Sequence, residues 1–199
     1  MKKILIIPAV LLLTGCFTKP ETPDDVAHYE NDVPTNIRVD LSIGQTTGEK
    51  GYIEIVGEDI CINEQVPESY NTYFYIHWSN DGYSFYRKEQ NKDWEVIVPV
   101  GTYAKADREN AINSLVGYTG SAFSELFNIK LVNGYKSNGT NEMLGFTTDT
   151  YDTEQYFYCL SMQHKMFFKC MPHEDVNPDW GFEVTAVKSI SSFTVQPTL

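Results

Sequence analysis

The chain has 199 residues, 42% of them hydrophobic, and a formal charge of −12. This length suffices for one domain with a sizeable core. The negative charge repels phosphate backbones, which argues against nucleic acid as a partner. It would speed association with a basic protein, and the alternative is that it serves solubility alone. The many aromatic residues, 13 Tyr and 11 Phe, favour strands over helices.

The first sixteen residues form a segment of their own. Lys2 and Lys3 give it a positive start, residues 4–13 form an apolar run, and the sequence LTGC ends it at Cys16. The run is too short for a stable membrane span, so it predicts a cleaved export signal, residues 1–15. The segment resembles the signal and lipobox of bacterial lipoproteins. The resemblance implies that Cys16 becomes the first mature residue and carries covalent lipid, and we expect no other cofactor.

Residues 16–36 are predicted to form a flexible tether. They contain several prolines and acidic residues and few large apolar ones. Residue 17 is Phe rather than Asp, which, by the sorting pattern of the lipoproteins that the signal resembles, implies an outer-membrane location. Removal of the signal takes away Lys2 and Lys3 and leaves a mature chain of charge −14.

Residues 37–199 are predicted to form one mainly β domain, an antiparallel sandwich with one or two short helices, with an α+β fold as the alternative. Alternating or apolar runs predict strands, and apolar residues at helical spacing predict two short helices. We expect strands at residues 37–43, 52–56, 59–62, 94–103, 143–148 and 181–195, hairpins at 72–89 and 155–171, and helices at 107–116 and 121–129.

The hairpin at residues 72–89 turns at Asn80-Asp81-Gly82, residues that tolerate positive φ. Alternation then predicts two faces. The core face carries Phe74, Ile76, Trp78, Tyr83 and Phe85, and the other face carries Tyr73, Tyr75, His77, Ser84, Tyr86 and Lys88. Tyr73, Tyr75, His77 and Tyr86 form a candidate binding face, because aromatic residues anchor protein interfaces. The alternative is that another layer covers this face and makes it core.

Three cysteines remain once Cys16 is lipidated. A two-residue turn at His164-Lys165 would place Cys159 directly opposite Cys170, within reach of a disulfide. We therefore predict a Cys159–Cys170 disulfide and a free Cys61, with a Cys61 bridge as the rival.

Motifs for a metal or for catalysis are weak. The best cation candidate is His173-Glu174-Asp175 with Asp179, and two prolines mark it as an exposed loop, so no metal is predicted. The sequence contains no GxSxG, HExxH, GxxxxGK[ST] or GxGxxG motif. We predict no catalytic residue and no enzyme, although a Ser–His–Asp arrangement assembles in space and spacing alone does not exclude it.

The stretch YIEIVGEDICIN, residues 52–63, resembles the strand–turn–Cys strand of small periplasmic lipoproteins proposed to be type VI secretion immunity proteins. The order of lipobox, tether and β-rich domain is similar too. This chain is longer, with a predicted helical insertion at residues 107–129, and the resemblance carries over no functional residue.

These features predict a lipid-anchored protein of the bacterial envelope that binds another protein, with an acidic surface suited to a basic partner. One hypothesis is an immunity protein that neutralises a delivered toxin. The alternatives are an accessory lipoprotein of a secretion, pilus or conjugation apparatus, and an envelope hydrolase.

Overall fold

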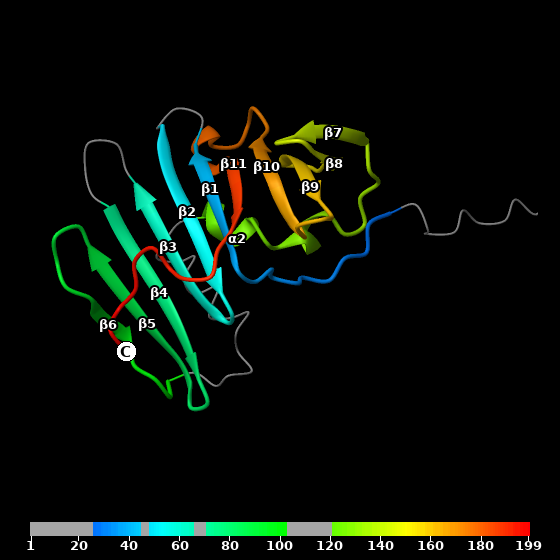
Figure 1. Cartoon of the computed structure of the whole chain (residues 1–199). Helices are drawn as coiled ribbons and strands as arrows, with labels where there is room; N and C mark the ends of the chain where they lie inside the picture. Colours follow the sequence, from blue (N-terminus) through cyan, green and yellow to red (C-terminus); the bar gives the residue numbers. More distant parts are fainter. Residues whose placement is uncertain (1–25, 45–47, 66–70, 103–120) are drawn as a thin grey trace, which may run out of the picture.

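In the part of the chain that the structure describes, eleven strands join edge to edge in one continuous antiparallel sheet (Figure 1). The computed structural model describes residues 26–44, 48–65, 71–102 and 121–199. The order of strands across the sheet is β6-β5-β4-β3-β2-β1-β11-β10-β9-β8-β7, so the chain builds one half outward from β1 and the other half from β7 back to β11. The predicted mainly β, antiparallel fold is confirmed.

The bounds of the elements follow the apolar patterns of the sequence. The first six strands are β1 (Ile37–Ile43), β2 (Glu49–Val56), β3 (Asp59–Gln65), β4 (Asn71–Ser79), β5 (Gly82–Glu89) and β6 (Glu95–Val98). The others are β7 (Gly139–Met143), β8 (Phe146–Asp152), β9 (Tyr156–Ser161), β10 (Met166–Pro172) and β11 (Phe182–Ser189). Among the described residues, the helical elements are α2 (Ser121–Glu125) and two 3-10 turns, η3 (Ile129–Val132) and η4 (Pro178–Trp180). The predicted helix at residues 107–116 lies outside the described residues.

One hydrophobic cluster lies on the inner face of the sheet, against α2 and η3. Phe123, Leu126 and Phe127 of the predicted second helix are buried in it. Gly51 of β2 permits this packing, because a Cβ there would lie 2.7 Å from the Asn63 carbonyl oxygen and 2.8 Å from the Phe123 ring. A single cluster thus joins both halves of the sheet and holds α2 on their common inner face.

The hairpin of β4 and β5 has the predicted register. Tyr75 lies opposite Tyr86 and Trp78 opposite Tyr83, with Asn80 and Asp81 in the turn. All five residues of the predicted core face, from Phe74 to Phe85, are buried in the hydrophobic cluster. The two predicted faces of this hairpin are therefore confirmed.

Three predicted strands differ from the observed ones. The predicted strand at residues 94–103 is observed as β6, Glu95–Val98, and a turn follows it at Val100 and Gly101. The predicted strand at residues 143–148 is split by a turn at Leu144 and Gly145, both with positive φ, into the end of β7 and the start of β8. The last predicted strand ends at Ser189 rather than at residue 195. Residues 190–199, which we call the C-terminal strap, run from β11 across the outer face of the sheet towards β6 (Figure 1).

Residues 26–36 belong to the packed domain, which corrects the predicted extent of the tether. Ala27 is buried and exchanges main-chain hydrogen bonds with Gly134 and Tyr135. The hydroxyl groups of Tyr29 and Tyr151 lie 2.7 Å apart. Composition alone did not reveal these contacts, because prolines and acidic residues are typical of flexible linkers. Residues 16–25 of the predicted tether lie outside the described residues.

Candidate functional site

The outer face of β1–β5 carries the residues of the predicted binding face. Alternation along each strand aligns one polar and aromatic row across the sheet, and its members are Arg38, Glu54, Cys61, Tyr75 and Tyr86. The C-terminal strap crosses this row. Outer faces of antiparallel sheets commonly meet water, but here Glu54, Cys61 and Tyr75 are at most 2% exposed. The strap thus turns the outer face into a second, polar core.

Tyr75 is the centre of an aromatic cluster. Its ring meets Tyr86 of β5 at 6.3 Å, Trp94 at 6.1 Å and Phe193 of the strap at 5.1 Å between ring centroids. Trp94 also meets Tyr73 at 6.5 Å. The covered alternative therefore holds for Tyr75, and the cover is the strap rather than a helix or a second sheet. Tyr73, His77, Tyr86 and Trp94 remain half-buried.

We call these four half-buried residues the aromatic rim. Three of them were predicted as a binding face. Trp94 was assigned only to the start of the predicted strand at residues 94–103, and in the structure it lies just before β6. Phe193 was missed because the sequence analysis placed it in the strand at residues 181–195, whereas β11 ends at Ser189 and Phe193 lies in the strap. The sequence holds no clear signal for this contact, because single apolar residues are common on protein surfaces.

Asp59 supports the aromatic rim through its contacts with Tyr75, His77 and the main chain of Trp78. Its Oδ2 accepts a hydrogen bond from the Tyr75 hydroxyl at 2.8 Å and lies 2.9 Å from His77 Nδ1. Its Oδ1 accepts from the Trp78 main-chain N–H at 2.8 Å. Burial, followed by the hydrogen bond to Asp59, raises the pKa of Tyr75 well above its ordinary value. Tyr75 therefore stays neutral and donates to Asp59 throughout the physiological range.

The pairing of Asp59 with His77 invites comparison with a catalytic triad, because Ser84 lies opposite His77 on the same face. Ser84, however, is 3% exposed, and its hydroxyl donates to the Tyr86 hydroxyl at 3.3 Å. A nucleophile needs its hydroxyl directed to the base and open to substrate. The contacts of Asp59, His77 and Ser84 therefore fit a structural support for the aromatic rim.

Glu54 fastens the strap to the sheet. This buried carboxylate accepts a hydrogen bond from the Thr194 main-chain N–H at 2.8 Å and another from the Thr194 hydroxyl. Arg38 Nη1 lies 2.9 Å from Glu54 and supplies the compensating charge. The Arg38 guanidinium also stacks on Tyr52, 3.7 Å from the ring centre. The strap is thus held by a buried charge pair as well as by Phe193.

The predicted cation loop forms ordinary surface contacts. His173 Nε2 lies 2.9 Å from Asp152 Oδ1 and 3.0 Å from the Thr153 carbonyl oxygen. Across the described ranges, no group of three or more His, Cys, Asp or Glu side chains is arranged to hold a metal. No helix within these ranges has the length and apolar character needed to span a bilayer.

The predicted Cys159–Cys170 disulfide is wrong in this structure. The turn after β9 comprises residues 162–165 rather than two residues, and β10 bulges between Phe167 and Lys169. Cys159 consequently lies opposite Lys169, and Cys170 lies opposite Tyr158. This one-residue shift places the two cysteines on opposite faces of the sheet.

The three cysteines of the described residues are free and buried: Cys61, Cys159 and Cys170. Only Cys61 was predicted to be free. Cys61 donates to the Val195 carbonyl oxygen of the strap at 3.4 Å, and Cys170 contacts Glu125 at 3.1 Å. Burial raises the pKa of each thiol, most clearly those of Cys61 and Cys170. Thiolates are the reactive form, so these cysteines should be inert in the native fold.

A thiol assay checks this arrangement. With Ellman's reagent, we expect the three thiols to react slowly in the folded protein and all to react after unfolding in guanidinium without reductant. A sample reduced before unfolding is the control and should give the same final count. A lower count without reductant, or a disulfide-linked peptide in a non-reducing digest, would contradict the structure.

A scan against models of known protein families and a search of curated proteins each gave no match to this chain.

Proposed function

We propose that this protein is a lipid-anchored lipoprotein of the bacterial envelope, in the outer membrane, that binds another protein through the aromatic rim. The resemblance of residues 1–16 to a lipoprotein signal supports the anchor. The formal charge of −12 supports a basic partner, because opposite charges speed association. A delivered toxin that the protein neutralises is the partner we favour within this class, on the resemblance of residues 52–63.

The observation that carries the binding proposal is the construction of the rim. Tyr73, His77, Tyr86 and Trp94 are half-buried, so each offers part of its ring to a partner. Beneath them, Tyr75 and Asp59 are fixed by hydrogen bonds and ring contacts. Aromatic side chains that are rigid before binding lose little entropy on contact, and such residues dominate the energetics of interfaces.

The anchor is tested by Cys16→Ser. The substitution removes the thiol that would carry the lipid, and with the acyl chains the protein loses its main membrane affinity. We expect the variant to leave the membrane fraction after expression in the native host, while the wild type sediments with membranes. Firm membrane retention of Cys16→Ser would refute the lipid anchor.

The rim is tested with Trp94→Ala. A pull-down from the native host with the wild-type protein, followed by mass spectrometry, identifies the partner, and titration of that partner then compares variants. We expect Trp94→Ala to weaken binding by more than about 1 kcal/mol, or about fivefold. Trp180→Ala is the matched control, since Trp180 is 52% exposed and lies away from the rim.

Equal loss of affinity in both tryptophan variants, or loss in Trp180→Ala alone, would place the interface elsewhere. The identity of the captured protein separates the two binding hypotheses. A secreted toxin would support the immunity role, and a component of a secretion, pilus or conjugation apparatus would support the accessory role.

A further inference from the structure

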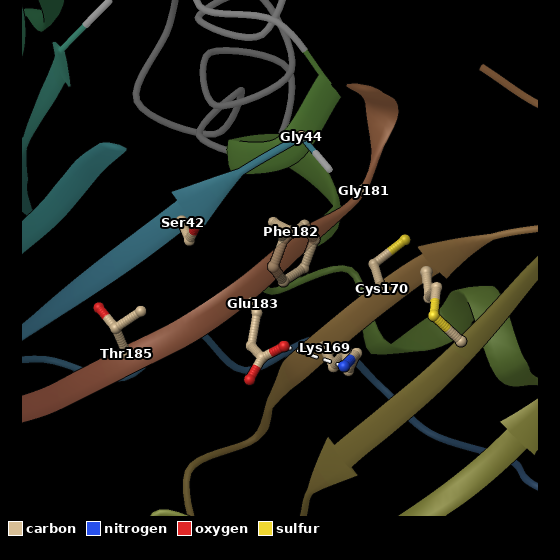
Figure 2. Close-up of a pocket in the computed structure, with 9 residues that line it drawn as sticks. Ser42, Gly44, Lys169, Cys170, Gly181, Phe182, Glu183 and Thr185 are labelled. Atoms are coloured by element: carbon tan, nitrogen blue, oxygen red, sulfur yellow. Dashed lines mark hydrogen bonds and ion pairs between the residues drawn. The ribbon is translucent and has the colours of Figure 1, made fainter. Parts of the chain in front are cut away.

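The sheet opens between β10 and β11. These strands pair at only two positions, Lys169 with Glu183 and Cys170 with Phe182. On its other side, β11 pairs with β1 from Phe182 to Ser189, with a bulge at Thr185. From Lys169 and Glu183 the two strands diverge, as Figure 2 shows. Within the described structure, residues 185–189 therefore have no ladder partner on the side away from β1.

The bulge in β10 produces this opening. Phe168 is the additional residue of the bulge, and the preceding Phe167 donates its main-chain N–H to the Leu126 carbonyl oxygen at 2.9 Å. Phe167 and Phe168 are both fully buried, so the hydrophobic cluster fixes β10 in this position. The opening is thus built into the core packing, because a regular β10 without the bulge would turn one of these two adjacent rings to the other face of the sheet.

The phase of the ladder shows which groups face the opening. Ile190 donates its main-chain N–H to the Asn36 carbonyl oxygen at 3.0 Å, just beyond the Ile37–Ser189 pair. Bonded and non-bonded pairs alternate in an antiparallel ladder. The N–H and C=O groups of Val187 and Ser189 therefore point away from β1 and into the opening. They present donors and acceptors at the spacing that an added strand requires.

A groove of about 430 Å³ lies at the closed end of the opening. Ser42, Glu183 and Thr185 line one side of it and Lys169 the other, and Glu183 and Lys169 form an ion pair at 2.9 Å (Figure 2). Glu183 is 50% exposed, so one face of its carboxylate remains available to a second cation. Space for side chains thus adjoins the free main-chain edge.

We infer that the opening between β10 and β11 is a second protein-binding site, which takes an extended segment of a basic partner as an added strand. The main-chain groups of Val187 and Ser189 bind the segment's backbone, and its side chains alternate between the groove and solvent. The formal charge of −12 and the half-exposed Glu183 favour Lys or Arg in that segment. This site uses neither the lipid anchor nor the aromatic rim, so it stands or falls independently of the proposed function.

The experiment begins with hydrogen exchange of the free protein. We expect the amides of Val187 and Ser189 to exchange much faster than those of Ala186 and Lys188, which face β1. A phage library of random 12-residue peptides is then selected on the detergent-solubilised full chain. We expect enriched peptides with alternating apolar and basic residues, and a synthetic copy should slow exchange at Val187 and Ser189.

Two variants of one residue test the main-chain contact. Ser189→Pro removes the N–H that faces the opening and leaves the ladder with β1 intact, whereas Ser189→Ala keeps that N–H. We expect the peptide to bind Ser189→Pro about fivefold more weakly, the loss of about one main-chain hydrogen bond, and Ser189→Ala unchanged. If Ser189→Pro unfolds, Thr185→Trp, which fills the groove, should weaken binding while Thr140→Trp on exposed β7 should not.

Several results would overturn the inference. Slow exchange of Val187 and Ser189 in dilute free protein would show that the edge is already covered. Concentration-dependent protection without peptide would make a second copy of this chain the occupant. A failure to enrich peptides, protection elsewhere in the chain, or equal weakening by Ser189→Pro and Ser189→Ala would exclude strand addition at this edge.

Discussion

Arg38→Met is expected to destabilise the protein by about 3 kcal/mol, because it leaves the Glu54 carboxylate buried without its compensating charge. Glu54 is 1% exposed and lies 2.9 Å from the Arg38 guanidinium. The two hydrogen bonds from Thr194 remain, but neither supplies a positive charge. Met preserves much of the apolar stem of Arg38, so the change removes the charge together with its pairing to Asp40 and its stacking on Tyr52. Urea unfolding followed by fluorescence measures the loss.

Lys188→Met is the matched control for this prediction. Lys188 forms an ion pair with Asp40 at 2.7 Å, and its side chain is 58% exposed. Exposed ion pairs contribute at most about 1 kcal/mol to stability. The double variant Arg38→Met/Glu54→Gln should regain at least half of the lost stability, since Gln removes the buried charge and still accepts from Thr194. A loss as small as that of Lys188→Met, or no rescue by Gln, would show that the charge pair does not hold the strap.

Local patterns in the sequence sufficed for the hairpin of β4 and β5 and for the division of its residues between two faces. The signal there is dense: strict alternation runs into a turn of Asn and Asp, and each choice agrees with the others. Pro99 at the end of the predicted strand at residues 94–103 indicates an edge or a bulge, because proline lacks the N–H that a ladder needs. The strand β6 does lie at one end of the sheet and pairs only with β5 among the described strands.

The register of β9 and β10 was not predictable in the same way. The bulge at Phe168 allows both Phe167 and Phe168 to be buried, and the hydrogen bond from Phe167 to Leu126 draws β10 towards α2. Both causes lie in tertiary packing, some forty residues away in sequence. An assumption of a regular two-residue turn therefore placed Cys159 opposite the wrong residue.

The strand residues of the candidate site were predicted from the sequence. The C-terminal strap that covers them was not. Tyr73, Tyr75, His77 and Tyr86 share a face because alternation requires it. Whether that face meets solvent depends on the C-terminal strap, whose attachment rests on single long-range contacts such as Thr194 to Glu54. No periodic pattern encodes a segment that is held by isolated contacts, so burial of Tyr75 emerges only from the fold.

Tyr75→Ala is expected to cost about 3–5 kcal/mol of unfolding free energy, the range for truncation of a large buried aromatic ring. Tyr75 is 2% exposed, and the change removes its contacts with Tyr86, Trp94 and Phe193 together with the hydrogen bond to Asp59. Because Phe193 loses its main aromatic neighbour, the strap should also loosen. Hydrogen exchange of residues 190–199 and urea unfolding measure the two effects.

Tyr75→Phe separates the ring from the hydroxyl. It keeps the ring contacts and removes one hydrogen bond, so it should cost only about 1 kcal/mol. Asp59 still accepts from the Trp78 N–H in that variant and still pairs with His77. Phe74→Ala on the inner face should cost as much as Tyr75→Ala, since Phe74 is 3% exposed in the hydrophobic cluster. An unchanged melting curve for Tyr75→Ala, beside a lowered one for Phe74→Ala, would mean that the strap does not cover this face in solution and that Tyr75 belongs to the exposed binding surface.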